Sequence, residues 1–225
     1  MEEGNNSNII NKNDDKPLKR KKDIFPFIEK KLKIDEEKYF SFVPYFVSKP
    51  NEWFETLKKE ISFEQKTVTV FGKEYLEPRL TSVHGKKEFL HLKYIYSKSS
   101  RSLKPMTSSL NLLVEDLKQF TGIDFDFVLL NFYRDGKDKI GWHSDDENMI
   151  DSSHVASISF GATRKFQIRH SISKKKIGEY FLDTGSLFWM KPGFQEIYQH
   201  QVPKEIKINK PRINLTFRRF RKDLK

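Results

Sequence analysis

The segment 141–147 (GWHSDDE) holds an imidazole and a carboxylate at a spacing that could bind a metal ion. His143 is followed two positions later by Asp145. In extended chain, residues i and i+2 point to the same side, so these side chains can offer a nitrogen and an oxygen to one ion. A third ligand from another strand would complete a two-histidine, one-carboxylate face, which leaves open positions and suits non-haem iron(II). Because such triplets also occur by chance, the pair alone is a hypothesis that needs its third ligand.

A second segment, 212–218 (RINLTFR), alternates strictly between polar and apolar residues. A strand has a side-chain period of two, so the polar residues share one face and the apolar residues the other. Guanidinium groups pair with carboxylates through two parallel hydrogen bonds, so two arginines on one face could hold a dicarboxylate. An ordinary half-exposed strand with its arginines in water is the alternative. The polar residues are Arg212, Asn214, Thr216 and Arg218.

Short strands must position both segments, because the pattern downstream of Phe125 has a period of two almost throughout. Clusters of Gly, Pro, Asp and Lys separate the segments, as is typical of antiparallel sheets. The predicted fold class is α+β, with an antiparallel jelly roll over residues 125–220 and supporting N-terminal helices. The predicted strands are Phe125–Tyr133, His154–Phe160, Lys165–His170, Tyr180–Leu182, Ser186–Met190 and Ile213–Phe220.

Two helices and a hairpin are predicted upstream of the jelly roll. Apolar residues recur at helical spacing from Pro50 to Ser62, where the proline suits a first turn. They recur again from Met106 to Phe120, and Gly122 is placed to end that helix. Between the helices, residues 67–75 (TVTVFGKEY) alternate around a glycine that can reverse the chain, which predicts a β-hairpin.

The composition favours a polyanionic partner and excludes cysteine chemistry. The 225 residues carry a net charge of +11 and contain no Cys. A field of this sign favours nucleic acid over an anionic membrane surface, and no apolar run approaches the roughly 18 residues of a membrane span. Without cysteine there are no disulfides, iron–sulfur clusters, thiolate zinc sites or Cys nucleophiles. Any metal must therefore be held by His and carboxylate.

One domain behind a polar tail is expected at this length. Residues 1–23 are rich in Asn, Lys and Asp, which predicts a disordered basic and polar tail, and residues 24–225 are expected to form the domain. Within the tail, Lys19-Arg20-Lys21-Lys22 could direct nuclear localisation, bind phosphate or be plain solvated chain. The first residues lack a signal peptide's apolar core. We therefore expect an intracellular monomer, with a nuclear location left open.

Five ordered motifs extend these separate patterns: residues 131–136 (NFYRDG), 143–147 (HSDDE), 157–162 (SISFGA), His200 and 211–218 (PRINLTFR). Together they resemble the AlkB-type iron(II)- and 2-oxoglutarate-dependent dioxygenases, and within that family the animal branch that repairs alkylated duplex DNA. The resemblance covers roughly residues 65–220. It implies the double-stranded β-helix of that family, preceded by a nucleotide-recognition region at 65–104 with a β-hairpin lid.

The resemblance also implies the iron ligands and the co-substrate pocket. The ligands would be His143, Asp145 and His200. His200 is preferred over His154 and His170 because it lies shortly before the arginine strand. Arg212 and Tyr133 would hold the distal carboxylate of 2-oxoglutarate, and Arg218 the carboxylate nearer the iron. The residues implied to complete this pocket are Asn131, Asn214 and Thr216.

Three protein ligands would leave three iron positions, two for the keto acid and one for O2. By the family's chemistry, 2-oxoglutarate would become succinate and carbon dioxide while an N-linked alkyl group is hydroxylated. A methyl group would then leave as formaldehyde and restore the base. This chemistry needs no side-chain nucleophile.

Substrate handling is predicted from residues 65–104 and from Glu147. A damaged base must leave the duplex stack before it can react, and Phe71 in the hairpin could fill the gap as an apolar wedge. By the resemblance, Tyr96 could stack on the flipped base opposite His143, while Tyr94 and Glu147 could read its polar edge. A buried Phe in an ordinary turn and two core tyrosines are the alternatives.

Several cations could contact phosphate, with binding that weakens as salt rises. In the duplex-repair branch a continuous basic run follows the distal histidine, whereas here Lys204-Glu205-Ile206-Lys207 is interrupted by an acid. A preference for duplex DNA is therefore left open. The candidate phosphate contacts are Lys86, Lys87, Arg101, Lys104 and Lys174-Lys175-Lys176.

The function predicted from these patterns is oxidative dealkylation of N-alkylated bases in DNA, with Fe(II) as the metal and 2-oxoglutarate and O2 as co-substrates. Three alternatives stay open. A nucleic-acid-binding module without turnover would need only the basic charge and the aromatic residues. An RNA demethylase or a protein hydroxylase would use the same iron centre on another substrate.

Overall fold

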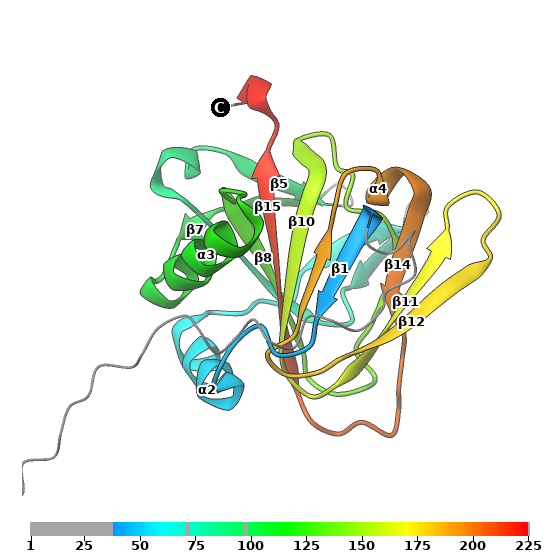
Figure 1. Ribbon diagram of the computed structural model, residues 1–225. Coiled ribbons are helices and arrows are strands. Elements are labelled where there is room, and N and C mark those ends of the chain that lie inside the picture. The colour runs from blue at the N-terminus through cyan, green and yellow to red at the C-terminus, as the bar shows by residue number, and fades with distance from the viewer. Residues whose placement is uncertain (1–37, 71–72, 97–98, 225) are drawn as a thin grey trace, which may run out of the picture. The chain divides into compact units, whose positions relative to one another are not determined.

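Two sheets form the framework of the structure, a computed structural model that describes residues 38–70, 73–96 and 99–224 (Figure 1). The larger sheet has seven strands in the order β1-β13-β10-β15-β8-β4-β7, and the smaller has four in the order β12-β11-β14-β9. The pairings within both sheets are antiparallel, except that β7 runs parallel to β4. The larger sheet contains β1 (Phe40–Val43), β13 (Leu187–Met190), β10 (Ile150–Gly161), β15 (Arg212–Phe220), β8 (Phe127–Tyr133), β4 (Leu80–Gly85) and β7 (Lys104–Pro105). The smaller sheet contains β12 (Lys176–Leu182), β11 (Arg164–His170), β14 (Tyr198–Val202) and β9 (Ile140–His143).

Two helices pack against one face of the larger sheet, on the same side of it in Figure 1: α2 (Pro50–Glu60) and α3 (Ser108–Thr121). Pro50 occupies the first turn of α2. At α3 the Thr107 side chain accepts a hydrogen bond from the backbone N–H of Leu110, and Gly122, with a φ of 75°, ends the helix in the left-handed region. The apolar face of β15, with Ile213, Leu215 and Phe217, is buried in the same core. Both predicted helices are therefore confirmed as scaffold.

The opposite face of the larger sheet meets the four-stranded sheet. An apolar cluster around Phe166, Phe188 and Phe194 joins β11, β13 and the one-turn helix α4 (Phe194–Ile197). The polar residues of β15 point to this side, between the two sheets. The predicted jelly roll and all six predicted strands are confirmed, with their ends shifted by a few residues.

Two small sheets lie in the region 65–104. β2 (Thr67–Val70) pairs with β3 (Lys73–Leu76), which confirms the hairpin, and β5 (Lys93–Tyr96) pairs with β6 (Ser99–Ser102). A short 3-10 helix, η1 (Lys87–Phe89), precedes β5, and η2 (Lys222–Leu224) follows β15. The hairpin turn with Phe71, and the predicted tail at 1–23, lie outside the described residues. Within the described ranges, no helix has the length and apolar character needed to cross a membrane.

Candidate active site

A pocket between the two sheets gathers residues from distant parts of the chain. β14 and β9 contribute from the smaller sheet, and β8, β10 and β15 from the larger one. β15 is flanked on both sides, with Asn214 opposite Asn131 of β8 and Ser159 of β10. This register fixes the polar residues of β15 on the pocket face. The lining residues are Tyr96, Leu129, Asn131, Tyr133, Ile140, His143, Asp145, Ser157, Phe166, Met190, His200, Val202, Arg212, Asn214, Thr216 and Arg218.

His143, Asp145 and His200 form a three-sided ligand set at one end of the pocket. Their candidate ligand atoms all lie within 4.8 Å of one another, and β-pairing sets His200 directly opposite His143. The Nε2 atoms of His143 and His200 lie 3.8 Å and 3.7 Å from the Asp145 carboxylate oxygens. Two ligands bound at about 2.1 Å can be at most about 4.2 Å apart, so each imidazole can share one ion with the Asp145 carboxylate. The three residues thus fit a divalent metal.

The imidazoles are held in the state that a metal ligand requires. His143 Nδ1 lies 2.8 Å from the carbonyl oxygen of Gly141, which places the proton on Nδ1 and leaves Nε2 free to coordinate. Burial lowers the pKa of His143, although Asp145 opposes this shift. Burial and the neighbouring His143 lower the pKa of His200 to about 3. Both rings are therefore neutral at physiological pH, and metal binding need not displace a proton from either.

Asp145 is fixed from two directions. Arg218 Nη2 donates to its Oδ1 at 2.5 Å, and its backbone N–H donates to Oε1 of the buried Gln195 at 2.9 Å. Burial alone would raise the pKa of Asp145, but Arg218 and the two imidazoles outweigh it and hold the pKa below its usual value. The ligand is therefore ionised and oriented. Gln195 comes from α4, which lies just before the strand that carries His200.

The far end of the pocket is built for an anion. Arg212 is 1% exposed, and among the described residues only its Nη2 has an acceptor, the Ser159 hydroxyl at 2.9 Å. Its Nε and Nη1 are buried without a hydrogen-bond partner, although burial lowers its pKa only to about 10 and it stays charged. Unpaired buried donors are costly, and a carboxylate would supply the missing acceptors. The Arg218 guanidinium, 3% exposed, also has an unpartnered Nε. The alternative of an ordinary half-exposed strand is thus wrong.

Tyr133 lies between two guanidinium groups at the Arg212 end. Arg212 and Arg164 lie over its ring at 5.2 Å and 5.5 Å from the centroid. Arg164 is buried and is held by Glu205 and by the carbonyl oxygens of Asp135, Asp138 and Pro203. Glu205, the acid that interrupts the basic run, therefore has a structural partner inside the protein. This pairing could not be predicted from sequence, because Arg164 and Glu205 are far apart in the chain.

The residues predicted to handle the base are placed differently from one another. Tyr96 lines the pocket, whereas Tyr94 is fully buried and lies beside it, with ring centroids 6.4 Å apart. The Tyr94 hydroxyl accepts from Arg218 Nη1 at 2.9 Å and donates to Glu147 Oε1 at 2.5 Å. Burial raises the pKa of Tyr94 well above its usual value, so it remains a donor. Glu147 keeps its other oxygen, Oε2, buried without a partner.

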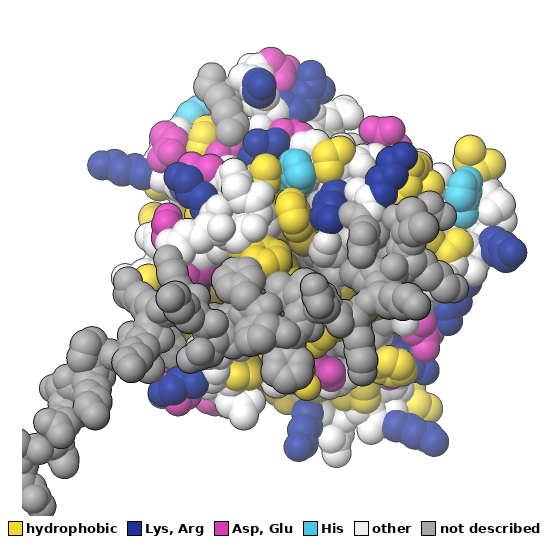
Figure 2. Space-filling model, in the orientation of Figure 1, with side chains coloured by type: hydrophobic (Ala, Val, Ile, Leu, Met, Phe, Trp, Pro, Cys, Tyr) yellow, Lys and Arg dark blue, Asp and Glu magenta, His cyan; other side chains and the backbone are white. Residues whose placement is uncertain are grey.

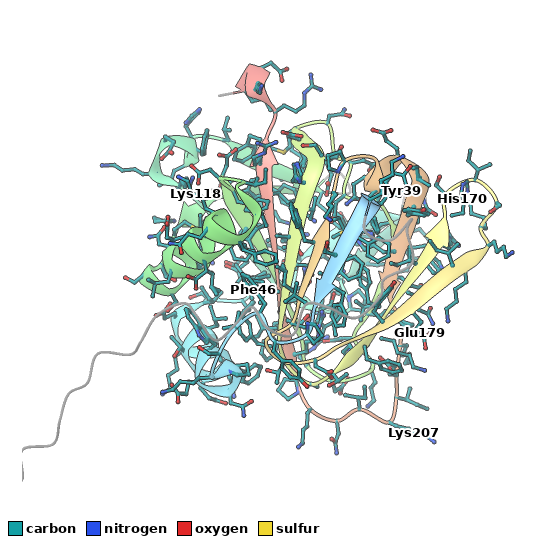
Figure 3. All side chains as sticks on the ribbon, in the orientation of Figure 1. Tyr39, Phe46, Lys118, His170, Glu179 and Lys207 are labelled. Atoms are coloured by element: carbon teal, nitrogen blue, oxygen red, sulfur yellow. The ribbon has the colours of Figure 1, made fainter. Side chains whose placement is uncertain are left out.

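Several other residues considered in the sequence analysis lie in the described part of the chain. Arg101 is 4% exposed and paired inside the protein, so its assignment as a phosphate contact is wrong: a guanidinium that is out of water cannot reach a backbone phosphate. Lys87 and Lys174–Lys176 are exposed. His170, labelled in Figure 3, lies at the loop end of β11 opposite Tyr198 and does not line the pocket. His154 stacks on Trp189. On the visible face, Lys and Arg alternate with Asp and Glu instead of forming one patch (Figure 2).

Sequence patterns missed several residues around the pocket. Ser157 and Ser159 were visible only as part of a motif, and Gln195 lies in a segment that had no predicted element. Arg79 donates from Nε to Asn131 Oδ1 at 2.7 Å and lies over the Tyr96 ring at 5.8 Å. No pattern in the sequence marks Arg79, which lies just before β4.

A jelly roll with a His-Asp-His ligand set at one end of its pocket and a buried arginine at the other is the architecture of an iron- and 2-oxoglutarate-dependent oxygenase. A family model described as "2OG-Fe(II) oxygenase superfamily" matches residues 40–218. The chain belongs to this superfamily.

Its curated relatives carry AlkB-type names. It is 37% identical over 175 residues to "Alpha-ketoglutarate-dependent dioxygenase alkB homolog 3" of Bos taurus, covering 73% of this chain and 59% of that protein. It is 36% identical over 181 residues to "DNA oxidative demethylase ALKBH2" of Homo sapiens, covering 76% and 68%. The chain thus spans about six-tenths of the length of the alkB homolog 3 proteins. The solved structure "The structure of OsALKBH1" matches 81% of the chain with a TM-score of 0.57 at 17% identity, which supports the fold.

The superfamily name specifies the metal and the co-substrate, and the residues present fit both. His143, Asp145 and His200 would hold Fe(II). Arg212, with its two unpartnered donors, and Arg218 would hold the carboxylates of 2-oxoglutarate. Bound together, the iron and the keto acid supply O2 activation.

Proposed function

We propose that this chain removes N-linked alkyl groups oxidatively from the bases of DNA. The observation that carries the proposal is the juxtaposition, in one pocket, of a metal ligand set, a buried anion site and the ring of Tyr96. The relatives named as DNA oxidative demethylase and alkB homolog 3 support the same class of substrate. The net charge of +11 favours a polyanion.

In this proposal the protein's own side chains bind and orient the reactants. Arg212 and Tyr133 hold the distal carboxylate of 2-oxoglutarate, Asn131, Asn214 and Thr216 line its sides, and Arg218 contacts the carboxylate near the metal. The pocket lies between two apolar clusters, which limit access of water to the reacting atoms. Hydroxylation of an N-linked methyl group would release formaldehyde and restore the base.

Base recognition in this proposal divides between a platform and a polar edge. The Tyr96 ring stacks on the flipped base opposite His143. Glu147, which does not itself line the pocket, would accept from an exocyclic amino group through Oε2, which has no partner among the described residues. Tyr94 is buried and does not line the pocket, so it acts on the base indirectly, by holding Glu147 through a 2.5 Å hydrogen bond. Phe71, outside the described residues, is retained as the proposed wedge.

We favour single-stranded nucleic acid at least as strongly as duplex. Glu205, the acidic residue in the segment 204–207, pairs with Arg164 and accepts from the backbone N–H of Lys165. It is therefore part of the folded framework. That segment therefore lacks the continuous positive charge that a grip on a second strand would use. Lys204 and Lys207 flank the acid on the loop before β15, where Figure 3 labels Lys207.

The test is a mass-spectrometric screen of alkylated oligonucleotides with Fe(II), ascorbate and 2-oxoglutarate. Single-stranded DNA, duplex DNA and RNA each carry one N-methylated base. We expect loss of the methyl mass in at least one DNA substrate, with succinate formed in equal amount. Glu147→Gln should weaken this reaction, whereas Glu196→Gln, on the exposed side of α4, should not.

Each alternative predicts a different result. Demethylation confined to RNA would assign the chain as an RNA demethylase. Tight DNA binding without succinate from any substrate would indicate a binding module, and succinate formed only with a protein substrate would indicate a protein hydroxylase. Any of these would overturn the proposal.

Three finer proposals accompany this function. We propose that residues 24–225 form the dioxygenase domain behind the tail at 1–23, that the protein is a monomer, and that Lys19-Arg20-Lys21-Lys22 directs it to the nucleus. Light scattering tests the monomer. Substituting the four basic residues in a fluorescent fusion tests the location.

A further inference from the structure

Three charged side chains outside the metal and co-substrate machinery are buried together beside the pocket. Glu77, Arg79 and Arg101 are 1%, 3% and 4% exposed. Glu77 Oε1 accepts from Arg79 Nη2 at 3.2 Å and from Arg101 Nη2 at 2.9 Å. We call these three residues the ion cluster. Two guanidinium groups share one carboxylate oxygen, so the cluster carries one excess positive charge.

Buried ion pairs contribute little to stability, because the cost of desolvation offsets most of the Coulomb attraction unless every polar atom of the pair is hydrogen bonded. Here Glu77 Oε2 and Arg101 Nε are buried without hydrogen-bond partners in the part of the chain that the structure describes. The positions that such a cluster gives to neighbouring side chains explain it better than a contribution to the free energy of folding.

The ion cluster joins elements that share few backbone hydrogen bonds. Glu77 lies at the base of the β2–β3 hairpin, where its N–H donates to the carbonyl of Lys66 at 2.8 Å. Arg101 comes from β6, opposite Tyr94 of β5. Its Nη1 donates to Thr81 of β4 at 2.9 Å. Both small sheets of the region 65–104 are thus tied through Glu77 to the edge of the seven-stranded sheet.

The two guanidinium groups of the ion cluster lie beside Tyr96, and one of them also contacts the co-substrate pocket. Arg79 and Arg101 lie 5.8 Å and 5.4 Å from the centroid of the Tyr96 ring, a cation–π distance. Arg79 also donates from Nε to Asn131 Oδ1 at 2.7 Å, on the wall of the co-substrate pocket. Glu77, Tyr133 and Tyr96 raise the pKa of Arg79 although burial opposes them, so the group stays charged.

We propose that Glu77 and Arg101 are positioning residues: through Arg79 they hold the Tyr96 ring as the platform for the base and tie it to Asn131 in the co-substrate pocket. The part that concerns the base rests on the proposed function. The part that concerns Asn131 does not. Neither Glu77 nor Arg101 lines the pocket, so both act only through other side chains.

Substitutions of Arg101 and Glu77 should weaken different binding steps. Arg101→Met keeps the length of the side chain and leaves Glu77 and Arg79 as a neutral pair. We expect KM for an alkylated single-stranded oligonucleotide to rise roughly threefold to tenfold through the lost contact with Tyr96. The value of kcat and the affinity for 2-oxoglutarate should stay within about twofold, since Arg79 keeps its bond to Asn131.

Glu77→Gln leaves two buried guanidinium groups without their counter-charge. Their repulsion should displace Arg79, so both KM for the oligonucleotide and Kd for 2-oxoglutarate should rise, each by roughly tenfold. In the double variant with Arg101→Met, one cation is removed, and the affinity for 2-oxoglutarate should return toward that of the wild type. Loss of stability alone would not produce this recovery in a ligand affinity.

The experiment has two independent measurements. Calorimetry on Mn(II)-loaded protein gives Kd for 2-oxoglutarate without nucleic acid, and steady-state demethylation gives kcat and KM. Glu64→Gln is the matched control, because Glu64 also pairs with two cations, Lys66 and Lys104, but on the surface. It should change neither quantity.

The inference is overturned if folded Arg101→Met leaves KM unchanged, or if folded Glu77→Gln binds 2-oxoglutarate as the wild type does. Should Glu77→Gln fail to fold, Arg101→Met and the double variant decide the matter. A wild type that demethylates no oligonucleotide would end the proposed function, while the calorimetric arm would still test the link to Asn131.

Discussion

The two halves of the pocket are held in different ways. Most of the iron and co-substrate half stands on strands paired on both sides, with β15 between β10 and β8 and His200 on β14 between β11 and β9, while His143 lies on β9 at the edge of the smaller sheet. The recognition half stands on the small sheets β2–β3 and β5–β6, each with two strands among the described residues. It is joined to the core mainly by side chains, including the ion cluster.

We infer that the iron and co-substrate half determines whether the reaction occurs, and that the recognition half determines which substrate is preferred. Ladder hydrogen bonds and register place His143 and His200 opposite each other on β9 and β14, and a one-residue slip of either strand would turn its histidine away from the pocket. Asp145 follows β9 and is held by Arg218 and Gln195. Side-chain contacts place the recognition half, so single substitutions there can adjust it by small steps. We therefore expect changes in the first half to abolish the reaction and changes in the second to alter which substrate is preferred.

The strongest test of the first half is His143→Ala. Removing one of three ligands should weaken metal binding and lower succinate formation by about a hundredfold or more. Metal affinity measured by Co(II) absorption, together with succinate yield, checks this. His170→Ala removes a histidine at the loop end of β11 and should leave both unchanged. Equal losses in the two variants would break the assignment.

Next in size is Arg212→Met. Losing a buried charged partner for a carboxylate should weaken 2-oxoglutarate binding by roughly ten- to a hundredfold, with metal affinity unaffected. Isothermal titration with 2-oxoglutarate measures the change. The matched control is Arg219→Met, which alters an arginine of the same strand that faces away from the pocket and pairs with Asp151. A weakened metal site in Arg212→Met would contradict separate roles.

In the recognition half, Phe71→Ala should slow demethylation of duplex substrate by roughly tenfold relative to single-stranded substrate, because only the duplex leaves a gap to fill. Rates on matched single- and double-stranded oligonucleotides give the ratio. Val68→Ala in the same hairpin should not change it. Equal slowing on both substrates would assign Phe71 a structural role.

The smallest effect concerns pH. His200 has a pKa of about 3 when folded, against 6.5 for the free side chain. Between these values the unfolded chain binds a proton that the native protein does not, so stability rises with pH and is lost as pH falls below 6.5. Each such group contributes about 1.4 kcal/mol per pH unit.

Urea unfolding of metal-free protein between pH 7 and roughly pH 4.5 measures this slope. His200→Asn should lower the slope of unfolding free energy against pH by about the contribution of one bound proton, since the substituted side chain does not titrate. An unchanged slope would mean that the imidazole at 200 is not buried in its neutral form.

Much of the scaffold was predictable from sequence. Alternation marked β15 and β10, helical spacing marked α2 and α3, and Thr67–Tyr75 marked the hairpin. β14 was missed, because Tyr198–Val202 has polar residues on both faces. β4 was missed because it is buried on both faces and has a polar residue on each, Thr81 and Ser82. Polar residues that face a pocket look like loop residues until the pocket is known.

By itself the sequence determined the local features of the chain. These are the segments that alternate between polar and apolar residues, the position of His143 two residues before Asp145, and the absence of cysteine as a competing metal ligand. The tertiary structure alone decided that Arg101 is buried, that Tyr94 supports Glu147 without lining the pocket, and that Glu205 neutralises Arg164. The physical reason is one of range. Periodicity is set by neighbours along the chain, whereas burial and charge pairing depend on residues that only folding brings together.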